Sequence, residues 1–177
     1  MRIVGGKYKG RVLATFDGKD VRPTSDMVRE SLFNILQFKI YGATFLDLFC
    51  GTGAMGIEAL SRGAKSVTFN DASKNSIGLL KTNLAKCKVE EQYQIKNQDA
   101  LFFLESNREQ FDFVYIDPPY STDLGKKALE KVKNCLSDDG VAIFEDEKPF
   151  ESQIEGLIQI DKRKYGRAYL TFFKKEN

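Results

Sequence analysis

Strand-like and helix-like segments alternate from about residue 45 onward, and this alternation constrains the fold more than any other feature. Nine segments make up the pattern: apolar, strand-like runs at 45–49, 66–70, 93–97, 111–117 and 140–145, and helix-like stretches at 54–62, 74–88, 99–106 and 123–137. Strands that are separated by helices pair in parallel, because each helix carries the chain back across the sheet. The sequence therefore predicts an α/β fold, with a mostly parallel sheet and helices on both faces.

Both ends of the chain depart from this pattern. Residues 1–13 alternate weakly around glycines, which is typical of a small β-hairpin. Apolar residues then recur at helical spacing in 22–38, and the proline near its start favours a helix there. Near the other end, 157–175 contains two strand-like runs joined around "KYG". We expect this segment to form an antiparallel hairpin at the edge of the sheet.

Length and composition fit one globular domain. The chain has 177 residues, of which 42% are hydrophobic and 29% charged, enough to bury a core without disulfides or a metal. We expect a single domain over 1–177, in which a basic extension (1–40) precedes a Rossmann-like core (41–177). No apolar run approaches the roughly 20 residues of a membrane span, and the first residues do not read as a secretory signal. We therefore expect a cytoplasmic protein.

Few reactive side chains are available for chemistry. Cys50, Cys87 and Cys135 lie far apart and form no CxxC pair, so we expect neither a disulfide framework nor a zinc site. The chain has no histidine, which removes the commonest acid–base group and metal ligand at neutral pH. Any reaction must therefore use carboxylates, hydroxyls, backbone groups or a cofactor, and we expect no metal.

Positive charge gathers at the two ends of the chain. Residues 1–29 hold seven Lys or Arg against three acids, and 161–175 hold six against one. The intervening residues 30–160 hold 14 basic residues against 20 acids. Such a distribution indicates a surface that faces a polyanion, although exposed hairpins also carry Lys and Arg simply to stay solvated.

A glycine-rich loop follows the first strand of the core. Gly51, Gly53 and Gly56 have GxGxxG spacing in "FLDLFCGTGAMGIEAL", between an apolar strand and an amphipathic helix. Glycine permits a tight turn and lets a ligand approach the backbone closely. The triplet alone also fits a plain strand-to-helix turn, so its interpretation depends on neighbouring residues.

Acidic residues follow the next two strands. Asp71 lies 20 residues beyond Gly51, where a carboxylate can accept both hydroxyls of a ribose, and Ala72 follows it. Asp99 follows the third strand, where it could accept from an adenine amino group while the amide of Ala100 meets a ring nitrogen. Each aspartate could instead cap a helix. Together they favour a nucleoside cofactor.

Asp47 lies within the first strand, only four residues before Gly51. In a nicotinamide dinucleotide site the loop amides would face a pyrophosphate, and a carboxylate so close would repel that anion. The same carboxylate suits a cationic ammonium or sulfonium. Asp47 therefore favours a positively charged nucleoside cofactor.

The strand at 111–117 runs into "DPPY", Asp117 to Tyr120. This tetrapeptide resembles the motif of S-adenosylmethionine-dependent methyltransferases that act on exocyclic amino groups of bases. There the Asp117 carboxylate and the Pro118 carbonyl would accept the two amine N–H bonds, favouring the positive charge that grows on nitrogen. Pro118 and Pro119 fix the backbone, and Tyr120 offers a stacking face worth roughly 1–3 kcal/mol. The amine proton leaves to Asp117 or to water.

The resemblance extends over nearly the whole chain. "MRIVGGKYKGR", "RPTSDMVRESLFNIL", "FLDLFCGTGAMGIEALSRGA" and "DPPY" together are similar to the bacterial RsmD family of 16S ribosomal RNA guanine-N2 methyltransferases. This resemblance implies a seven-stranded methyltransferase fold with a reversed last strand, S-adenosylmethionine as methyl donor and a guanine of a ribosomal particle as target. Thr24 or Ser25 could touch the carboxylate end of the cofactor, or could simply cap the helix that follows. We expect the protein to act as a monomer. The ribose role of Asp71 rests on an alignment in which Asn70 precedes it.

RNA contacts are expected from basic residues near both ends: Arg2, Lys7, Lys9, Arg11, Arg22, Arg29, Arg163 and Arg167. Three other functions remain open at this point. An adenine-N6 DNA methyltransferase fits "DPPY" equally well, but no insertion is large enough for a duplex-recognition domain. An NAD-dependent oxidoreductase fits the glycines but leaves Asp47 and "DPPY" unexplained. A non-catalytic RNA-binding domain could retain a relic of the pocket.

Overall fold

The computed structural model describes residues 1–16, 26–119 and 122–176 of the chain. Helices and strands alternate along it as the sequence predicts. The elements follow in this order: α1 (Asp26–Leu36), β1 (Thr44–Asp47), α2 (Ala54–Ser61), β2 (Ser66–Asn70), α3 (Lys74–Lys86), β3 (Gln92–Lys96), α4 (Ala100–Ser106), β4 (Phe111–Ile116), α5 (Leu124–Val132), the 3₁₀ turn η1 (Lys133–Cys135), β5 (Leu136–Asp146), β6 (Leu157–Tyr165) and β7 (Ala168–Lys175).

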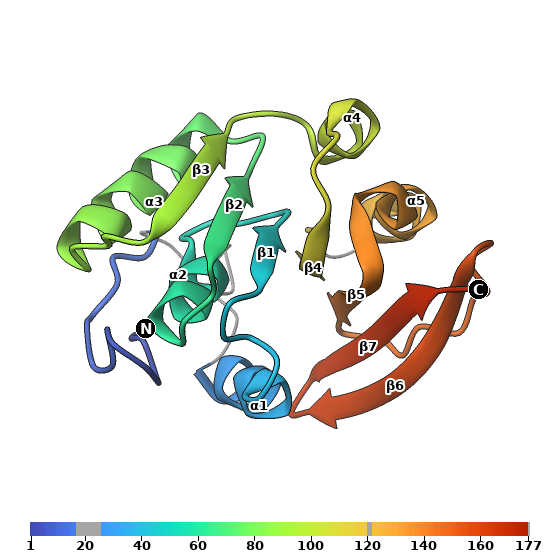
Figure 1. The fold of residues 1–177 in the computed structure, drawn as a ribbon, viewed down its shortest axis with the longest axis horizontal. Helices are drawn as coiled ribbons and strands as arrows, with labels where there is room; N and C mark the ends of the chain where they lie inside the picture. Colours follow the sequence, from blue (N-terminus) through green and yellow to red (C-terminus); the bar gives the residue numbers. More distant parts are fainter. Residues whose placement is uncertain (17–25, 120–121, 177) are drawn as a thin grey trace.

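The strands of the described residues form one sheet in the order β3–β2–β1–β4–β5–β7–β6 (Figure 1). β1 pairs in parallel with both β2 and β4, and the pairs β2–β3 and β4–β5 are parallel as well. β7 runs antiparallel to both of its neighbours, β5 and β6. The predicted sheet, mostly parallel with an antiparallel C-terminal strand, is confirmed.

The strand order reverses between β1 and β4. From β1 the chain moves outward through β2 to β3, whereas β4 begins a second series on the other side of β1. Loops that leave the carboxyl ends of β1 and β4 therefore diverge, and ligands of open α/β sheets bind in the crevice between such loops. We therefore expect the candidate site between these two loops.

Two apolar clusters cover the two faces of the sheet. One cluster includes Leu32 of α1 and Leu80 of α3, and the other includes Leu129 of α5. Successive residues of a strand point to opposite faces, so that β4 sends Tyr115 into the first cluster and Ile116 into the second. The near-continuous apolar sequence of β4 is explained by burial on both sides.

The largest difference from the predicted boundaries lies between α5 and β5. The helix expected over 123–137 ends at Val132, and β5 begins at Leu136 rather than at residue 140. Leu136 is fully buried and pairs with Phe111 of β4, with a register shift before the regular ladder resumes. Burial of this leucine in the sheet therefore overrides the local helical spacing.

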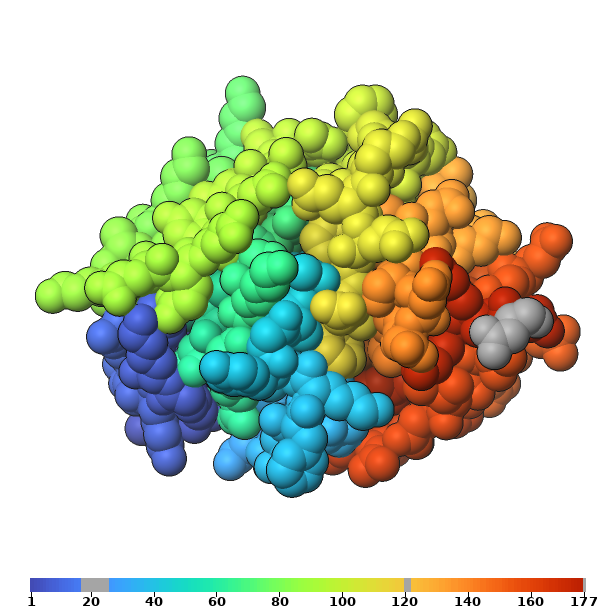
Figure 2. All heavy atoms as spheres, viewed as in Figure 1, coloured from blue at the N-terminus to red at the C-terminus, as the bar shows by residue number. Residues whose placement is uncertain are grey.

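Residues 1–16 pack against α2 and α3, as Figure 2 shows with this segment in dark blue. The expected N-terminal hairpin is confirmed: Arg2 and Val12 form an antiparallel bridge, and the amides of Ile3 and Leu13 donate to the carbonyl oxygens of Arg11 and Met1 at 3.0 and 3.1 Å. Its turn also contacts α2, because the amide of Tyr8 donates to the Ser61 hydroxyl oxygen at 2.8 Å. Apolar side chains of the segment belong to the same cluster as α1, α2 and α3. The extension and the core are therefore packed together.

The contact between α2 and β2 generates a stability prediction. A Cβ added at Gly56 would lie 2.2 Å from Cε1 of Phe69, so the helix would have to move away from the sheet. We expect Gly56→Ala to lower the free energy of unfolding by about 1–3 kcal/mol, the usual cost of overpacking. Urea denaturation followed by circular dichroism measures the change.

Gly78→Ala is the matched control, because this glycine lies in α3 and its added Cβ would meet nothing within 4 Å. Alanine should raise the free energy of unfolding there by about 0.5–1 kcal/mol, since it restricts the unfolded chain and favours the helix. Equal effects of the two substitutions would contradict the close helix–sheet approach at Gly56.

Candidate active site

The candidate site lies where β1 and β4 end side by side. Asp47 is in register with Tyr115, and the amide of Leu48 donates to the Tyr115 carbonyl oxygen at 3.1 Å. The glycine loop begins three residues beyond Leu48, and Asp117 lies two residues beyond Tyr115. Parallel pairing therefore brings the two sequence motifs to one edge of the sheet, as predicted.

The glycine loop presents an open backbone on one side. Gly51 has φ +50°, and a Cβ built there would meet nothing within 4 Å. Gly53 has φ +80°, and its Cβ would lie 2.2 Å from Cδ1 of Leu80. The first glycine therefore leaves room for a ligand, whereas the second permits close packing on α3. Both positions require a left-handed backbone that favours glycine.

Gly56 contributes packing, and its expected contact with a cofactor stays a prediction. It is buried inside α2, against Phe69. Its amide donates to Oδ2 of Asp47 at 3.0 Å. The third glycine of the motif therefore fixes the helix on the sheet and helps to hold the carboxylate beneath the loop.

Asp47 is a buried carboxylate, with 1% of its surface exposed. Burial raises its pKa to about 7; the Gly56 hydrogen bond opposes this rise, and the nearby negative charge of Asp71 adds to it. A group with this pKa is partly protonated near neutral pH, and a neighbouring cation would favour its ionised form. The site is therefore electrostatically suited to a positively charged ligand group.

Asp71 is half-buried and contacts the glycine loop directly. Its Oδ2 accepts from the Gly51 amide at 2.9 Å, and its Oδ1 accepts from the Ser73 amide at 2.8 Å. The side-chain amide of Asn97 donates to the carbonyl oxygens of Asp71 and Ala72 at 2.8 and 3.0 Å. A carboxylate can accept about four hydrogen bonds, so Asp71 keeps acceptor capacity for ribose hydroxyls.

Asn70 is a positioning residue that sequence reasoning did not identify. It is fully buried, and its side-chain amide donates to the carbonyl oxygens of Leu48 and Gln98 at 3.1 and 3.2 Å. These carbonyls follow β1 and β3, on either side of β2. One side chain therefore holds three consecutive strand ends together. A polar residue at the end of an apolar strand was the only available signal.

Asp99 caps α4. Its Oδ1 accepts from the amides of Leu101 and Phe102 at 2.9 and 3.0 Å, while the residue itself is exposed. This is the capping alternative that the sequence left open. A capping carboxylate retains acceptor positions on its other oxygen, so the predicted contacts of Asp99 and Ala100 with an adenine ring remain predictions.

The "DPPY" segment leaves β4 at the same edge of the sheet. Asp117 is half-buried, Pro118 is buried and Pro119 is exposed. The Pro119 carbonyl oxygen accepts from the Thr122 hydroxyl at 2.8 Å, which closes the turn toward α5. Tyr120 lies outside the described residues, so its stacking role stays a prediction.

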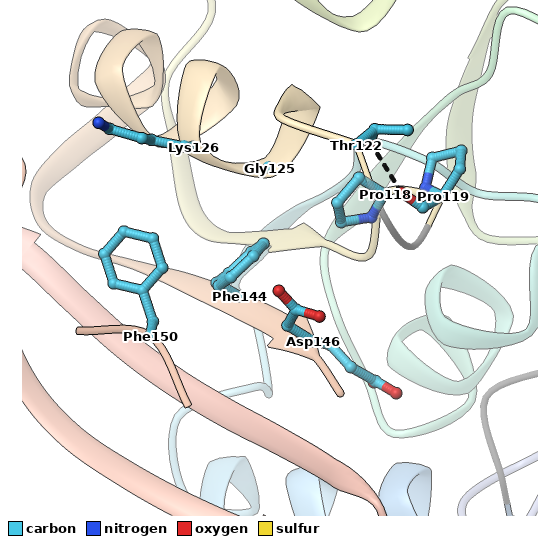
Figure 3. Close-up of a pocket in the computed structure, with 9 residues that line it drawn as sticks. Pro118, Pro119, Thr122, Gly125, Lys126, Phe144, Asp146 and Phe150 are labelled. Atoms are coloured by element: carbon cyan, nitrogen blue, oxygen red, sulfur yellow. Dashed lines mark hydrogen bonds between the residues drawn. The ribbon is translucent and has the colours of Figure 1, made fainter. Parts of the chain in front are cut away.

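A cavity of about 100 Å³ adjoins the two prolines (Figure 3). Its walls come from the Pro118–Pro119 turn, from the start of α5, from the end of β5 and from Phe150 beyond that strand; Phe144 and Phe150 provide aromatic surface. Two acidic residues, Glu145 and Asp146, also line it. The cavity therefore combines apolar walls with hydrogen-bond acceptors, a combination typical of small-molecule sites.

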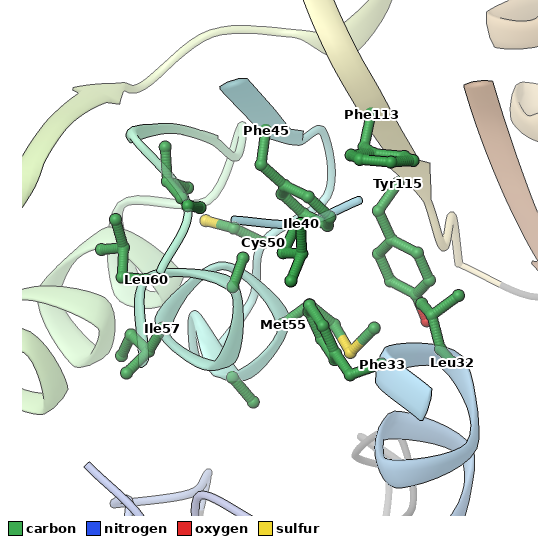
Figure 4. Packing of buried hydrophobic residues seen from close by; sticks show 14 of the residues in the cluster. Leu32, Phe33, Ile40, Phe45, Cys50, Met55, Ile57, Leu60, Phe113 and Tyr115 are labelled. Atoms are coloured by element: carbon green, nitrogen blue, oxygen red, sulfur yellow. The ribbon is translucent and has the colours of Figure 1, made fainter. Parts of the chain in front are cut away.

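Glu145 links this cavity to the buried side of the sheet. The Tyr115 hydroxyl donates to Oε2 of Glu145, and both residues are almost completely buried. Figure 4 shows the Tyr115 ring beside Leu32 of α1, with Met55 of α2 nearby. The wall of the cavity is therefore fixed by contacts that reach into the core.

Of the basic residues expected to meet RNA, Arg29 is the one that the structure corrects. Its side chain is fully buried, where it donates to Asp26 and to the Arg2 carbonyl oxygen, both at 2.6 Å, and lies 3.6 Å from Glu58. A guanidinium enclosed in this way holds the N-terminal segment on α1 and α2. It cannot reach a polyanion without unfolding this contact.

The other basic residues differ in how they are placed. Lys7 pairs with Glu90 and Glu91 at 3.0 and 2.9 Å, and these hydrogen bonds raise its pKa. The Arg11 guanidinium lies over the Tyr8 ring, and Arg163 pairs with Asp161. Arg2, Lys9 and Arg167 are exposed, whereas Arg22 and Thr24 lie outside the described residues.

Cys50 follows β1 but does not offer a reactive thiolate. Burial raises its pKa, and the negative charges of Asp47 and Asp71 raise it further.

Among the described residues, no group of three or more potential ligands could hold a metal ion. In the same part of the chain, every helix is too short or too polar to span a membrane.

Comparison with known proteins places this geometry beside methyltransferases. The family model described as "Conserved hypothetical protein 95" matches residues 1–174. A relative from Haemophilus influenzae, named ribosomal RNA small subunit methyltransferase D, is 39% identical over 153 residues, covering 84% of this chain and 79% of the relative. The putative rRNA methyltransferase YlbH of Bacillus subtilis is 33% identical over 182 residues, 99% of each chain.

A solved structure supports the same relationship. The putative methyltransferase yhhF from Escherichia coli has a TM-score of 0.86 and 28% sequence identity. The match covers 100% of this chain and 98% of that one. The similarity therefore extends over the entire fold and includes the N-terminal segment as well as the sheet.

The raised pKa of Asp47 predicts a pH-dependent gain of stability in Asp47→Asn. The folded-state pKa of about 7 exceeds the ordinary value of 3.8, so the cost of ionising Asp47 is full above pH 7, decreases as pH falls below the folded pKa, and disappears only below pH 3.8. The neutral amide lacks the cost. We expect the variant's gain in free energy of unfolding to be larger at pH 8 than at pH 5, by on the order of 2–3 kcal/mol.

Urea denaturation of both proteins at the two pH values measures this difference. Asp138→Asn is the control, because Asp138 is fully exposed and should change little at either pH. An Asp47→Asn effect that is the same at pH 5 and pH 8 would show that the buried carboxyl is not destabilised by ionisation.

Proposed function

The chain belongs to the family described as conserved hypothetical protein 95, and from this membership we propose that it is an S-adenosylmethionine-dependent RNA methyltransferase. Its substrate is the exocyclic N2 amine of a guanine in small-subunit ribosomal RNA, within a ribosomal particle. The observation that carries the proposal is the pairing of β1 with β4, which brings the glycine loop and Asp117 to one edge of the sheet. Relatives named as ribosomal RNA methyltransferases support the choice of substrate.

The residues at the ends of β1 and β2 fit the cofactor. S-adenosylmethionine supplies an electrophilic methyl group on a positively charged sulfonium. The open side of Gly51 leaves room for the atoms of the cofactor that approach the loop backbone, and Asp47 places a buried carboxylate under the loop. Asp71 would bind the ribose hydroxyls with its remaining acceptor positions. A pyrophosphate would instead meet two carboxylates here, which disfavours the nicotinamide alternative.

The Asp117–Pro118 corner would activate the amine. The lone pair of an exocyclic amine is delocalised into the purine ring, so it attacks poorly without help. The Asp117 carboxylate and the Pro118 carbonyl accept its two N–H bonds and stabilise the positive charge that develops on nitrogen. Two consecutive prolines keep these acceptors in place before the substrate arrives, so that little reorganisation is needed during the reaction.

Guanine is favoured over adenine by the Asp146 carboxylate of the adjoining cavity. The Watson–Crick edge of guanine presents N–H donors at N1 and N2, whereas adenine presents an acceptor at N1. Asp146 lines the same cavity as Pro118, and a carboxylate attracts the first edge but repels the ring nitrogen of the second. A base held there must leave its helix, as other base-modifying enzymes require.

RNA binding would use the exposed basic side chains of both ends. Arg2 and Lys9 lie on the N-terminal segment and Arg167 lies in the β6–β7 turn, all of them exposed. Contacts of this kind hold phosphates and position the substrate without reading its sequence. The pairing of Lys7 with two glutamates makes it a weaker candidate.

The central experiment measures transfer of a labelled methyl group to small ribosomal subunits, naked ribosomal RNA and duplex DNA. Nucleoside mass spectrometry then identifies the product. We expect N2-methylguanosine from the ribosomal substrate. N6-methyladenine in DNA would instead establish the adenine alternative.

Asp117→Asn tests the role of the carboxylate. The amide turns one of its two acceptor atoms into a donor, so we expect kcat to fall by at least about 100-fold. The dissociation constant for S-adenosylhomocysteine should change little, because Asp117 is assigned to the amine. Asp123→Asn, an exposed neighbour paired with Lys127, is the control and should keep normal turnover. Full activity of Asp117→Asn would exclude the proposed mechanism.

A further inference from the structure

Asn83 is a fully buried polar residue in α3, away from all the motifs of the sequence. Its Oδ1 accepts from the Ala14 amide at 2.7 Å, and its Nδ2 donates to the Ala14 carbonyl oxygen at 3.0 Å. The same Nδ2 donates to the Thr52 carbonyl oxygen at 2.9 Å. One side chain therefore connects the N-terminal segment with the glycine loop.

These three hydrogen bonds fix the orientation of the Asn83 amide. Two of its partners are carbonyl oxygens, which only accept, and the third is an amide N–H, which only donates. A flipped side chain would set its oxygen against both carbonyls. The contact is therefore specific for asparagine, since alanine removes it and aspartate lacks both donors.

The contact to Thr52 restrains the loop at a point that Asp71 does not reach. The Asp71 carboxylate holds the Gly51 amide at 2.9 Å. Because a peptide unit is planar, holding the Thr52 carbonyl also sets the direction of the Gly53 N–H, which donates to the Cys50 carbonyl oxygen at 2.7 Å. Asp71 and Asn83 thus restrain the Cys50–Gly51 and Thr52–Gly53 peptide units, which lie on either side of the Gly51–Thr52 unit in one glycine-rich turn.

We propose that Asn83 is a positioning residue for the cofactor, which it serves by holding the glycine loop in its binding conformation and by coupling that loop to the N-terminal segment at Ala14. This inference rests on the proposed function. Glycine residues lose more conformational freedom than any other residue when they are ordered. A loop that is already ordered loses less when its ligand binds, so the contact increases affinity without touching the ligand.

Coupling through one side chain has a reciprocal consequence. If Asn83 links the loop to Ala14, then a ligand that stabilises the loop also stabilises the hydrogen bond at the Ala14 amide by the same coupling free energy. That amide should exchange its hydrogen more slowly when the ligand is bound. The link therefore has a readout that does not depend on catalysis.

The test is calorimetry with S-adenosylhomocysteine on the full chain. We expect Asn83→Ala to raise the dissociation constant about tenfold or more, and to raise the KM for S-adenosylmethionine while kcat at saturation stays near its normal value. Leu84→Ala is the matched control, because Leu84 is the next residue of α3 and is buried in the core. It should lower the melting temperature and leave the dissociation constant unchanged.

Hydrogen exchange completes the test, and its first measurement uses only the unmodified protein. Addition of S-adenosylhomocysteine should slow exchange at the Ala14 amide, and in Asn83→Ala this protection should vanish. Equal weakening by Leu84→Ala, normal affinity of Asn83→Ala, or no protection at Ala14 would each overturn the inference. Absence of any binding to the unmodified protein would overturn the proposed function and this inference with it, which distinguishes the two failures.

Discussion

The parallel pairing of β1 with β4 is the constraint on which the rest of the site depends. Asp47 lies opposite Tyr115, and the next hydrogen bond of the ladder joins Leu48 to the same tyrosine. Both strands are apolar and buried on two faces, so a slip of one residue would move every side chain to the opposite face, where it would not fit the cluster packed there. Hydrophobic burial therefore sets the register, and the register brings the glycine loop and the Asp117–Pro118 corner together.

Negative charge at this edge is tolerated because backbone amides and a bound cation can compensate it. The carboxylates of Asp47 and Asp71 accept amides from the glycine motif, yet burial still raises the pKa of Asp47 to about 7. Such a perturbed group costs folding stability and is typical of functional sites. The stability lost there is supplied by the two apolar clusters and by the polar contacts that fasten residues 1–16 to α2 and α3.

The sequence predicted the order of elements and the meeting of the two motifs, because both follow from apolar periodicity and from the geometry of parallel sheets. It did not predict Asn70 or Asn83, whose importance comes from contacts between residues far apart in the chain. It also misplaced Arg29, because sequence alone suggests that a charged side chain lies at the surface. Only the structure shows that Arg29 is buried beside Glu58. The hairpin expected at the N-terminus did form, but its contact with α2 through Ser61 joins residues far apart in the chain and was not predicted.

The most direct measurement is a crystal structure of the protein with S-adenosylhomocysteine bound. The proposed account predicts that the sulfur lies over the junction of β1 and β4, facing the Asp117 carboxylate and the Pro118 carbonyl, with the ribose hydroxyls on Asp71. A ligand bound at the opposite edge of the sheet, or with its sulfur turned away from that corner, would contradict the account.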